Sequence, residues 1–320
     1  MNELSNLVSI VVPIYNESGS VELLTKEILK VMNVNNIYFE LILVNDGSND
    51  STLQILNKLS LNIKELKVLN LRKNYGQTAA MAAGFDYSNG EIIISLDGDL
   101  QNDPNDIPKL IETIKEGYDL VCGWRFERKD KFISRRIPSN LANKLIGFVT
   151  GINLHDYGCS LKAFRKEIVK DIKLYGELHR FLPILANIEG AKIKEIKVNH
   201  RSRIYGTSKY GIDRTFRVLM DLLTVWFMNK FLTRPMYVFG FIGIVSIVSS
   251  LIISSYLILL KFLGEDIGSR PLLMFALILG IAVVQLFSFG LLGELLMRTY
   301  HESQSRPIYR IRSIFDKNKN

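Results

Sequence analysis

Three side chains that can bind a metal ion are spaced two residues apart in the segment Asp97-Gly98-Asp99-Leu100-Gln101. The segment follows Ile92–Leu96, an apolar run that predicts a buried strand. Alternate residues that leave a strand point to the same side, so Asp97, Asp99 and Gln101 can converge on one point. Two carboxylates and an amide oxygen suit Mg²⁺ or Mn²⁺, which keeps coordination sites for phosphate oxygens. The alternative is a polar turn that caps the following helix.

Polar segments also end three other apolar runs of the N-terminal part. Pro13-Ile14-Tyr15-Asn16-Glu17 and Val44-Asn45-Asp46-Gly47-Ser48 each carry a carboxylate that can accept hydrogen bonds from a base or a ribose. Arg72-Lys73-Asn74-Tyr75-Gly76-Gln77 brings positive charge to the place where a diphosphate would lie. A turn followed by a helix N-cap is the alternative for Asn45–Ser51.

These segments need a scaffold that gathers them, and the pattern before Tyr118 predicts one. Strands are predicted at Val8–Ile14, Phe39–Val44, Leu66–Leu71 and Ile92–Leu96, and helices at Val21–Met32, Thr52–Leu59 and Gly76–Tyr87. Strands that alternate with helices at short spacing indicate βαβ units and a parallel sheet. In such an α/β fold the carboxyl ends of the strands share one edge, and ligands bind there.

The amino-acid composition limits only in part the kinds of ligand that the protein can bind. The chain has 320 residues, a formal net charge of +8 and two cysteines, Cys122 and Cys159. A basic balance suits nucleic acid, anionic lipid headgroups or phosphorylated substrates. Two thiols and no signal-peptide pattern favour a reduced, cytosolic catalytic part. Basic residues are dense between Arg125 and Arg136, where a solvated or lipid-facing loop is the alternative to a phosphate site.

Two long uncharged segments, Tyr237–Leu260 and Leu272–Phe289, lie near the C-terminus. The first has about 24 residues, enough to cross a hydrocarbon core of about 30 Å. Joined by the loop Lys261–Pro271 they predict a transmembrane hairpin, and a pair of buried core helices is the alternative. Residues 212–235 are amphipathic and predict helices in the membrane interface. Lys and Arg are denser outside the hairpin than in its loop, so the positive-inside rule places both termini in the cytoplasm.

The motifs in this order resemble those of glycosyltransferase family 2, which has the GT-A fold, a Rossmann-like α/β architecture. The matching patterns are PxYNE, then DGS, then RxNxG, then DGDLQxxP, each at a predicted strand end. The arginines that follow and the two apolar segments resemble the dolichol-phosphate-mannose synthase-like branch, whose members glycosylate polyprenyl phosphates. The resemblance covers essentially the whole chain and is nearest to bacterial undecaprenyl-phosphate glucosyltransferases.

The resemblance implies roles for individual residues on the donor side. It assigns a divalent metal, Mg²⁺ or Mn²⁺, to Asp97, Asp99 and Gln101, and it makes Asp99 catalytic as well. The nucleotide of the donor falls to a set of residues at the strand ends, namely Pro13, Tyr15, Glu17, Asp46 and Asp97.

On the acceptor side the resemblance points to the phosphate of the lipid. The run Val121–Arg125 matches the family's V-x-G-S-R pattern, with Trp124 in place of the small polar residue. The implied phosphate-binding residues are Arg125, Arg135, Ser139, Arg203 and Lys209. Arginine suits this task because its guanidinium grips phosphate with two parallel hydrogen bonds. The family's catalytic aspartate falls loosely on Asp156, which either removes a proton or only orients other groups.

These implications predict an inverting transfer of a hexose, glucose from UDP-glucose, to undecaprenyl phosphate. The expected partners are a nucleotide-sugar, a polyprenyl phosphate and the inner cell membrane, with no nucleic acid and with homo-oligomerisation left open. The expected organisation is a catalytic domain over 1–211, juxtamembrane helices over 212–235, two spans over 236–298 and a basic cytoplasmic tail over 299–320. A processive polysaccharide synthase and a non-catalytic membrane scaffold are the alternatives.

Overall fold

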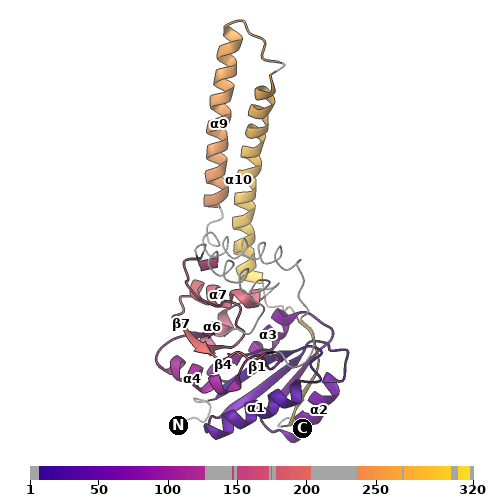
Figure 1. The fold of residues 1–320 in the computed structure, drawn as a ribbon. Helices are drawn as coiled ribbons and strands as arrows, with labels where there is room; N and C mark the ends of the chain where they lie inside the picture. Colours follow the sequence, from indigo (N-terminus) through magenta and orange to yellow (C-terminus); the bar gives the residue numbers. More distant parts are fainter. Residues whose placement is uncertain are drawn as a thin grey trace. The chain divides into compact units, whose positions relative to one another are not determined.

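The structure, a computed structural model, describes residues 7–126, 146–147, 150–172, 174, 178–202, 236–268, 270–303 and 309–317. The chain forms two compact units (Figure 1). One comprises Met1–Val225 together with Pro307–Asn320, and the other comprises Trp226–Arg306. The predicted interfacial helices, residues 212–235, lie outside the described residues.

The larger unit is built on one mixed sheet of eight strands in the order β7-β5-β6-β4-β1-β2-β3-β8. The strands are β1 (Val8–Ile14), β2 (Phe39–Asn45), β3 (Leu66–Leu71), β4 (Ile92–Ser95), β5 (Leu120–Arg125), β6 (Lys162–Arg165), β7 (Ile193–Val198) and β8 (Ile311–Asp316). The parallel sheet predicted for the first four strands is present: β1 pairs in parallel with β2 and β4, and β2 pairs in parallel with β3. Strand β6 is antiparallel to both β4 and β5, an insertion that the sequence does not reveal.

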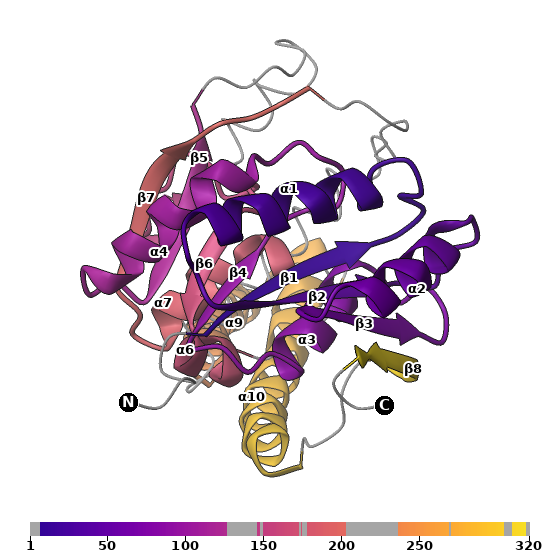
Figure 2. The same cartoon turned by 90° about the horizontal axis from the view of Figure 1, so that it is seen from below.

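Helices cover both faces of this sheet. The helical elements of the unit are α1 (Val21–Val34), α2 (Thr52–Asn62), α3 (Gln77–Asp86), η2 (Pro104–Asp106), α4 (Ile107–Lys115), α6 (Lys166–Asp171), η4 (Leu178–Phe181) and α7 (Leu182–Ile188). Helices α1, α2 and α4 lie on one side of the sheet and α3, α6 and α7 on the other (Figures 1 and 2). This is the two-sided α/β architecture that the alternating pattern predicts.

The core follows from the apolar character of the central strands. Side chains of β1 and β2 are almost entirely buried on both faces, as a parallel sheet covered by helices requires. Helix α3 is rich in Ala and Gly, which lets its backbone approach β1 closely. A Cβ atom at Gly84 would lie 2.2 Å from Cγ1 of Val11, so the contact needs glycine there.

The end of the chain returns to this sheet. Sequence patterns predict a basic tail over 299–320, whereas Ile311–Asp316 forms β8, antiparallel to β3. The Arg72 N–H donates to the Arg310 carbonyl over 3.0 Å, and Asn70 donates to the Ser313 hydroxyl over 3.3 Å. Ile311–Asp316 therefore form an edge strand of this sheet.

The smaller unit is a hairpin of two long helices, α9 (Met236–Phe262) and α10 (Pro271–Ser303). Their stretches Phe239–Phe262 and Pro271–Gly293 are long and apolar enough to cross a membrane, and only 11% of each is buried. Core helices of a soluble domain would be mostly buried, so that alternative does not fit. Ser250 donates to the Ala276 carbonyl over 2.9 Å, which ties the two helices together.

Candidate active site

The segment Asp97–Gln101, called the metal motif below, follows the end of β4 after Leu96. It lies at the edge of the sheet where β1 and β2 also end. Its backbone does not continue as an extended strand. Gly98 and Asp99 form a turn, and Leu100 has a φ of +63°, a left-handed conformation that is uncommon for a bulky residue. The turn folds the Asp99 carboxylate back, so that Oδ1 accepts a hydrogen bond of 3.1 Å from the Gln101 N–H. The simple alternation expected from a strand end therefore does not describe how these three residues are arranged, and the turn is a strained segment of the kind found at functional sites.

The metal motif packs tightly against the end of β1. A Cβ atom on Gly98 would lie 2.6 Å from Cδ1 of Ile14, so a larger residue there would require the Ile14 side chain to move. The Ser20 hydroxyl bridges them, with contacts of 2.9 Å to the Gly98 carbonyl and 2.8 Å to Oε2 of Glu17. Pro13, Tyr15 and Glu17 thus belong to the same edge as the metal motif, as predicted from their place at a strand end.

Asp97 lies in a charged and half-buried setting. The side-chain amide of Gln77 donates to its Oδ1 over 2.8 Å. Burial, and after it the negative charge of Asp99, raise the pKa of Asp97 to about 6, while a hydrogen bond from Ser160 and the charge of Arg125 act in the opposite direction. A bound cation would relieve this unfavourable ionisation of Asp97.

The oxygen ligands that these side chains can offer to a metal ion fit Mg²⁺ or Mn²⁺. Among the described residues, no group of three or more His, Cys, Asp or Glu side chains gathers as a metal site. The ligands that the protein can offer here are two carboxylates and, by prediction, the amide of Gln101. A hard cation bound by so few protein oxygens keeps positions for phosphate oxygens.

Asp46, at the end of β2, holds the loop that follows β3. Its two carboxylate oxygens accept hydrogen bonds from the N–H groups of Tyr75 and Gly76, at 2.7 and 2.9 Å. Gly47 lies so close to this loop that a Cβ atom would be 2.4 Å from the carbonyl carbon of Lys73. The contact of Asp46 with a nucleotide remains a prediction, and its observed partners are backbone amides.

Arg125 and Asp156 form a buried ion pair near the metal motif. The guanidinium Nε and Nη2 contact the two carboxylate oxygens at 2.6 and 2.9 Å. Glu195 holds this aspartate in turn, because its Oε1 accepts from the Asp156 N–H over 2.9 Å. Burial acts to lower the pKa of Arg125, and the hydrogen bond and charge of Asp156 outweigh it, so the pKa lies above its ordinary value. The two residues thus act as a unit.

Four predicted acceptor residues, Arg135, Ser139, Arg203 and Lys209, lie outside the described residues. The structure does show what precedes the last two. His200 forms an isolated antiparallel bridge with Asn102, immediately after the metal motif. His200 and Arg201 therefore lie beside Gln101 and Asn102.

Sequence reasoning missed several residues of this edge. Gln77 contacts Asp97, and the next residue, Thr78, has its hydroxyl 2.7 Å from Nδ1 of His179. His179 lies in η4. Ser160 accepts a hydrogen bond of 2.7 Å from the Asn102 side chain. Ser160 and His179 follow no motif spacing, because η4 and the segment before β6 reach this edge only through the tertiary fold.

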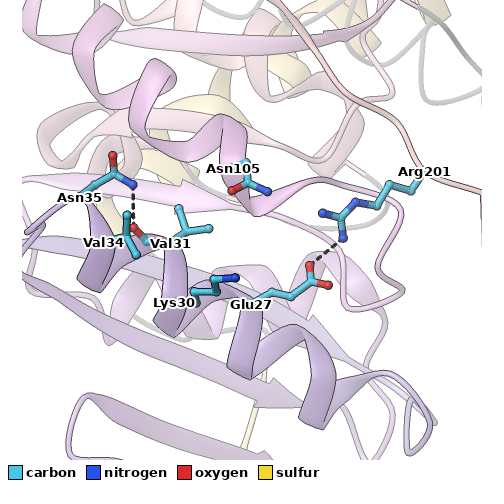
Figure 3. A pocket seen from close by; sticks show the side chains of 7 residues that line it. All are labelled: Glu27, Lys30, Val31, Val34, Asn35, Asn105 and Arg201. Carbon is cyan, nitrogen blue, oxygen red and sulfur yellow. Dashed lines mark hydrogen bonds and ion pairs between the residues drawn. The ribbon is translucent and has the colours of Figure 1, made fainter.

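A pocket of about 310 Å³ lies to one side, between α1, η2 and the segment after β7 (Figure 3). It is lined by Glu27, Lys30, Val31, Val34, Asn35, Asn105 and Arg201. None of these is a predicted site residue, so the pocket is not where the donor and acceptor are expected.

Comparison with known proteins agrees with this geometry. Residues 9–173 match the family described as glycosyl transferase family 2. The match covers β1 to α6 and with them both carboxylates of the metal motif, so the chain belongs to glycosyl transferase family 2 and is a glycosyltransferase.

Relatives over nearly the full length are polyprenyl-phosphate glycosyltransferases, as the sequence predicted. A dodecaprenyl-phosphate galacturonate synthase of Rhizobium johnstonii is 45% identical over 313 residues, which cover 96% of this chain and 93% of the relative. An undecaprenyl-phosphate 4-deoxy-4-formamido-L-arabinose transferase of Photorhabdus laumondii is 37% identical, with 98% and 95% covered.

A solved structure of similar fold is glucosyl-3-phosphoglycerate synthase of Mycobacterium tuberculosis, in complex with Mn²⁺ and UDP-glucose. The TM-score is 0.54 at 17% identity, with 70% of this chain and 79% of the other covered. At that identity the likeness supports the GT-A fold alone.

Proposed function

We propose that this enzyme transfers one sugar from a nucleotide-sugar to a polyprenyl phosphate, with inversion at the anomeric carbon. An oxygen of the acceptor phosphate attacks the anomeric carbon. The bond between that carbon and the donor diphosphate breaks, and the nucleoside diphosphate leaves. The acceptor phosphate is already ionised near neutral pH, so the step needs no strong general base.

The observation that carries this proposal is the convergence on one sheet edge. The ends of β1, β2 and β4 meet there in parallel register, and the buried Arg125–Asp156 pair lies near the same carboxylates. Full-length relatives at 45% and 37% identity bear names of polyprenyl-phosphate sugar transfer.

Each group has a role in this scheme. Asp97, Asp99 and Gln101 would hold a divalent cation, which when bound neutralises the charge that develops on the leaving diphosphate. Pro13, Tyr15, Glu17 and Asp46 would line the nucleotide. Arg125, which pairs with Asp156 through Nε and Nη2, would contact the acceptor phosphate. Asp156 acts by orienting Arg125, and Arg135, Ser139, Arg203 and Lys209 would complete the acceptor site.

The experiment that tests the proposal is a donor panel with the detergent-solubilised enzyme, Mg²⁺ and undecaprenyl phosphate. UDP-glucose is the predicted donor. UDP-galacturonic acid and a UDP-linked 4-formamido pentose belong in the panel because relatives are named for those sugars. The expected product is a lipid whose mass has grown by one sugar, at a rate that depends on the lipid phosphate.

Two results would count against it. A product ladder of many sugars would indicate a processive synthase. Failure of every donor to react in the presence of lipid and metal would indicate a scaffold that keeps the transferase fold without the activity.

A further inference from the structure

Arg201 connects three separate parts of the catalytic unit. Its Nη1 lies 2.7 Å from Oε2 of Glu27 on α1, and its Nη2 lies 2.7 Å from Oδ1 of Asp103, two residues after the metal motif (Figure 3 shows the Glu27 contact). Its backbone N–H donates to the carbonyl of Gln101 over 2.9 Å. One residue thus contacts a predicted metal ligand through its main chain and the flanking loop through its side chain.

The neighbouring residues reinforce this arrangement. Asn199 donates from its side chain to Oδ2 of Asp103 over 2.9 Å and from its N–H to Oδ2 of Asp106 over 2.7 Å. The Asp103 carboxylate also accepts a hydrogen bond from the N–H of Asn105, and through this bond Asp103 caps the start of η2. Both oxygens of Asp103 are therefore occupied by protein donors, and its side chain is only 10% exposed.

This geometry matters because the metal motif is strained. Leu100 is held at a positive φ, and such a conformation persists only where surrounding contacts fix it. Gln101, which follows, is fixed from outside its own turn by the N–H of Arg201. We propose that Arg201 is a positioning residue that holds Gln101 and the end of the metal motif in the geometry that binds the cation, an inference that rests on the proposed function.

Arginine suits this position for a chemical reason. Its planar fork offers two nitrogens, and here each contacts a different carboxylate. Lysine has a single ammonium and can satisfy one of the two partners well. Arg201→Lys should therefore keep part of the positioning of the metal motif, and Arg201→Gln should lose it.

The test measures Mn²⁺ affinity by electron paramagnetic resonance in the presence of UDP, without lipid or turnover. Arg201→Gln should weaken Mn²⁺ binding by about tenfold, the lower range for groups that orient metal ligands, and Arg201→Lys should weaken it less. Arg165→Gln is the matched control: Arg165 also joins separate segments, with contacts to the Tyr118 and Ile114 carbonyls, and belongs to no predicted site. The control should leave Mn²⁺ affinity unchanged even if it lowers thermal stability.

The outcomes separate this inference from the proposed function. Unchanged Mn²⁺ affinity in Arg201→Gln, with normal binding by the wild type, overturns the positioning role while leaving the transferase proposal intact. Failure of the wild type to bind Mn²⁺ counts against the metal part of the proposed function. In that case amide hydrogen exchange of the Gln101–Asp106 segment tests the structural part of the inference. Faster exchange in Arg201→Gln than in Arg165→Gln supports Arg201 as the residue that holds this segment, and equal exchange overturns it.

Discussion

Replacing Asp156 by Asn tests whether this residue is a base or the partner that orients Arg125. The carboxylate contacts Nε and Nη2 of Arg125 at 2.6 and 2.9 Å, with 3% of the Asp156 side chain and 17% of the Arg125 side chain exposed. Asparagine keeps the shape and one acceptor oxygen and removes the charge. The guanidinium then remains in the protein interior without its counterion.

The magnitude follows from that burial. Breaking a buried ion pair by removing one partner costs about 3–5 kcal/mol, because the other charge stays uncompensated. The partial exposure of Arg125 favours the lower end, about 3 kcal/mol. For a unit of this size each kcal/mol shifts Tm by about 2–4 °C, so Asp156→Asn should lower Tm by about 6–12 °C.

Activity distinguishes the two roles when a second variant is added. If Asp156 acts through Arg125, Asp156→Asn and Arg125→Gln should reduce kcat/KM by similar factors. The double variant should then lose little more than either single one, because the two side chains work as a unit.

The assay is lipid-dependent transfer with each variant at saturating donor and Mg²⁺, alongside thermal unfolding in the same detergent. An activity loss in Asp156→Asn that exceeds the loss in Arg125→Gln by about a hundredfold would identify Asp156 as a base, since general base catalysis contributes about that much. A Tm decrease of less than about 2 °C would contradict the free-energy cost expected when Arg125 loses its buried counterion.

Three further predictions concern other parts of the chain. Asp99→Ala should reduce transfer by at least about a hundredfold at saturating Mg²⁺ while the protein stays folded, and wild-type turnover would refute the metal assignment. Hydrogen bonds from Ser9 and Asn89 and the charge of Lys67 lower the pKa of Glu40 below its ordinary 4.5 despite the opposing effect of burial. Its stabilising contribution is present above that value and is lost as pH falls through the lowered pKa, so the stability gap to Glu40→Gln, measured by urea unfolding, should narrow in acid. A cysteine at Glu265, in the hairpin loop, should react with an impermeant reagent added outside intact cells. Both native cysteines are buried, and labelling only after lysis would reverse the predicted orientation.

Much of the catalytic fold could be predicted because its signal is local. Runs such as Val8–Ile14 and Leu66–Leu71 are continuous, apolar and bounded by turn residues, and the structure has strands at those residues. Strands β6 and β8 could not be predicted in the same way. Each is short and carries charges, and each pairs with a strand far away in the sequence. Their formation depends on tertiary context and not on local pattern.

The same distinction between local sequence signal and tertiary contact applies to the site. The residues at the ends of β1, β2 and β4 could be placed because strand ends of a parallel sheet share an edge. The contacts between them could not: no spacing rule joins Gln77 to Asp97 or Arg125 to Asp156. The left-handed backbone of Leu100 is equally hidden, since leucine is a residue that rarely adopts it.

The return of the chain to the sheet as β8 bears on topology independently of charge. Met1–Val225 and Pro307–Asn320 belong to one folded unit, and β8 is paired with β3 in one sheet. Two spans between the halves of a single domain must begin and end on the same side of a membrane. The side itself remains a prediction from the positive-inside rule: the basic residues flanking the hairpin predict the cytoplasm. Ends of the hairpin on opposite sides of the membrane would separate β8 from β3 and expose the edge of β3, which now has a partner.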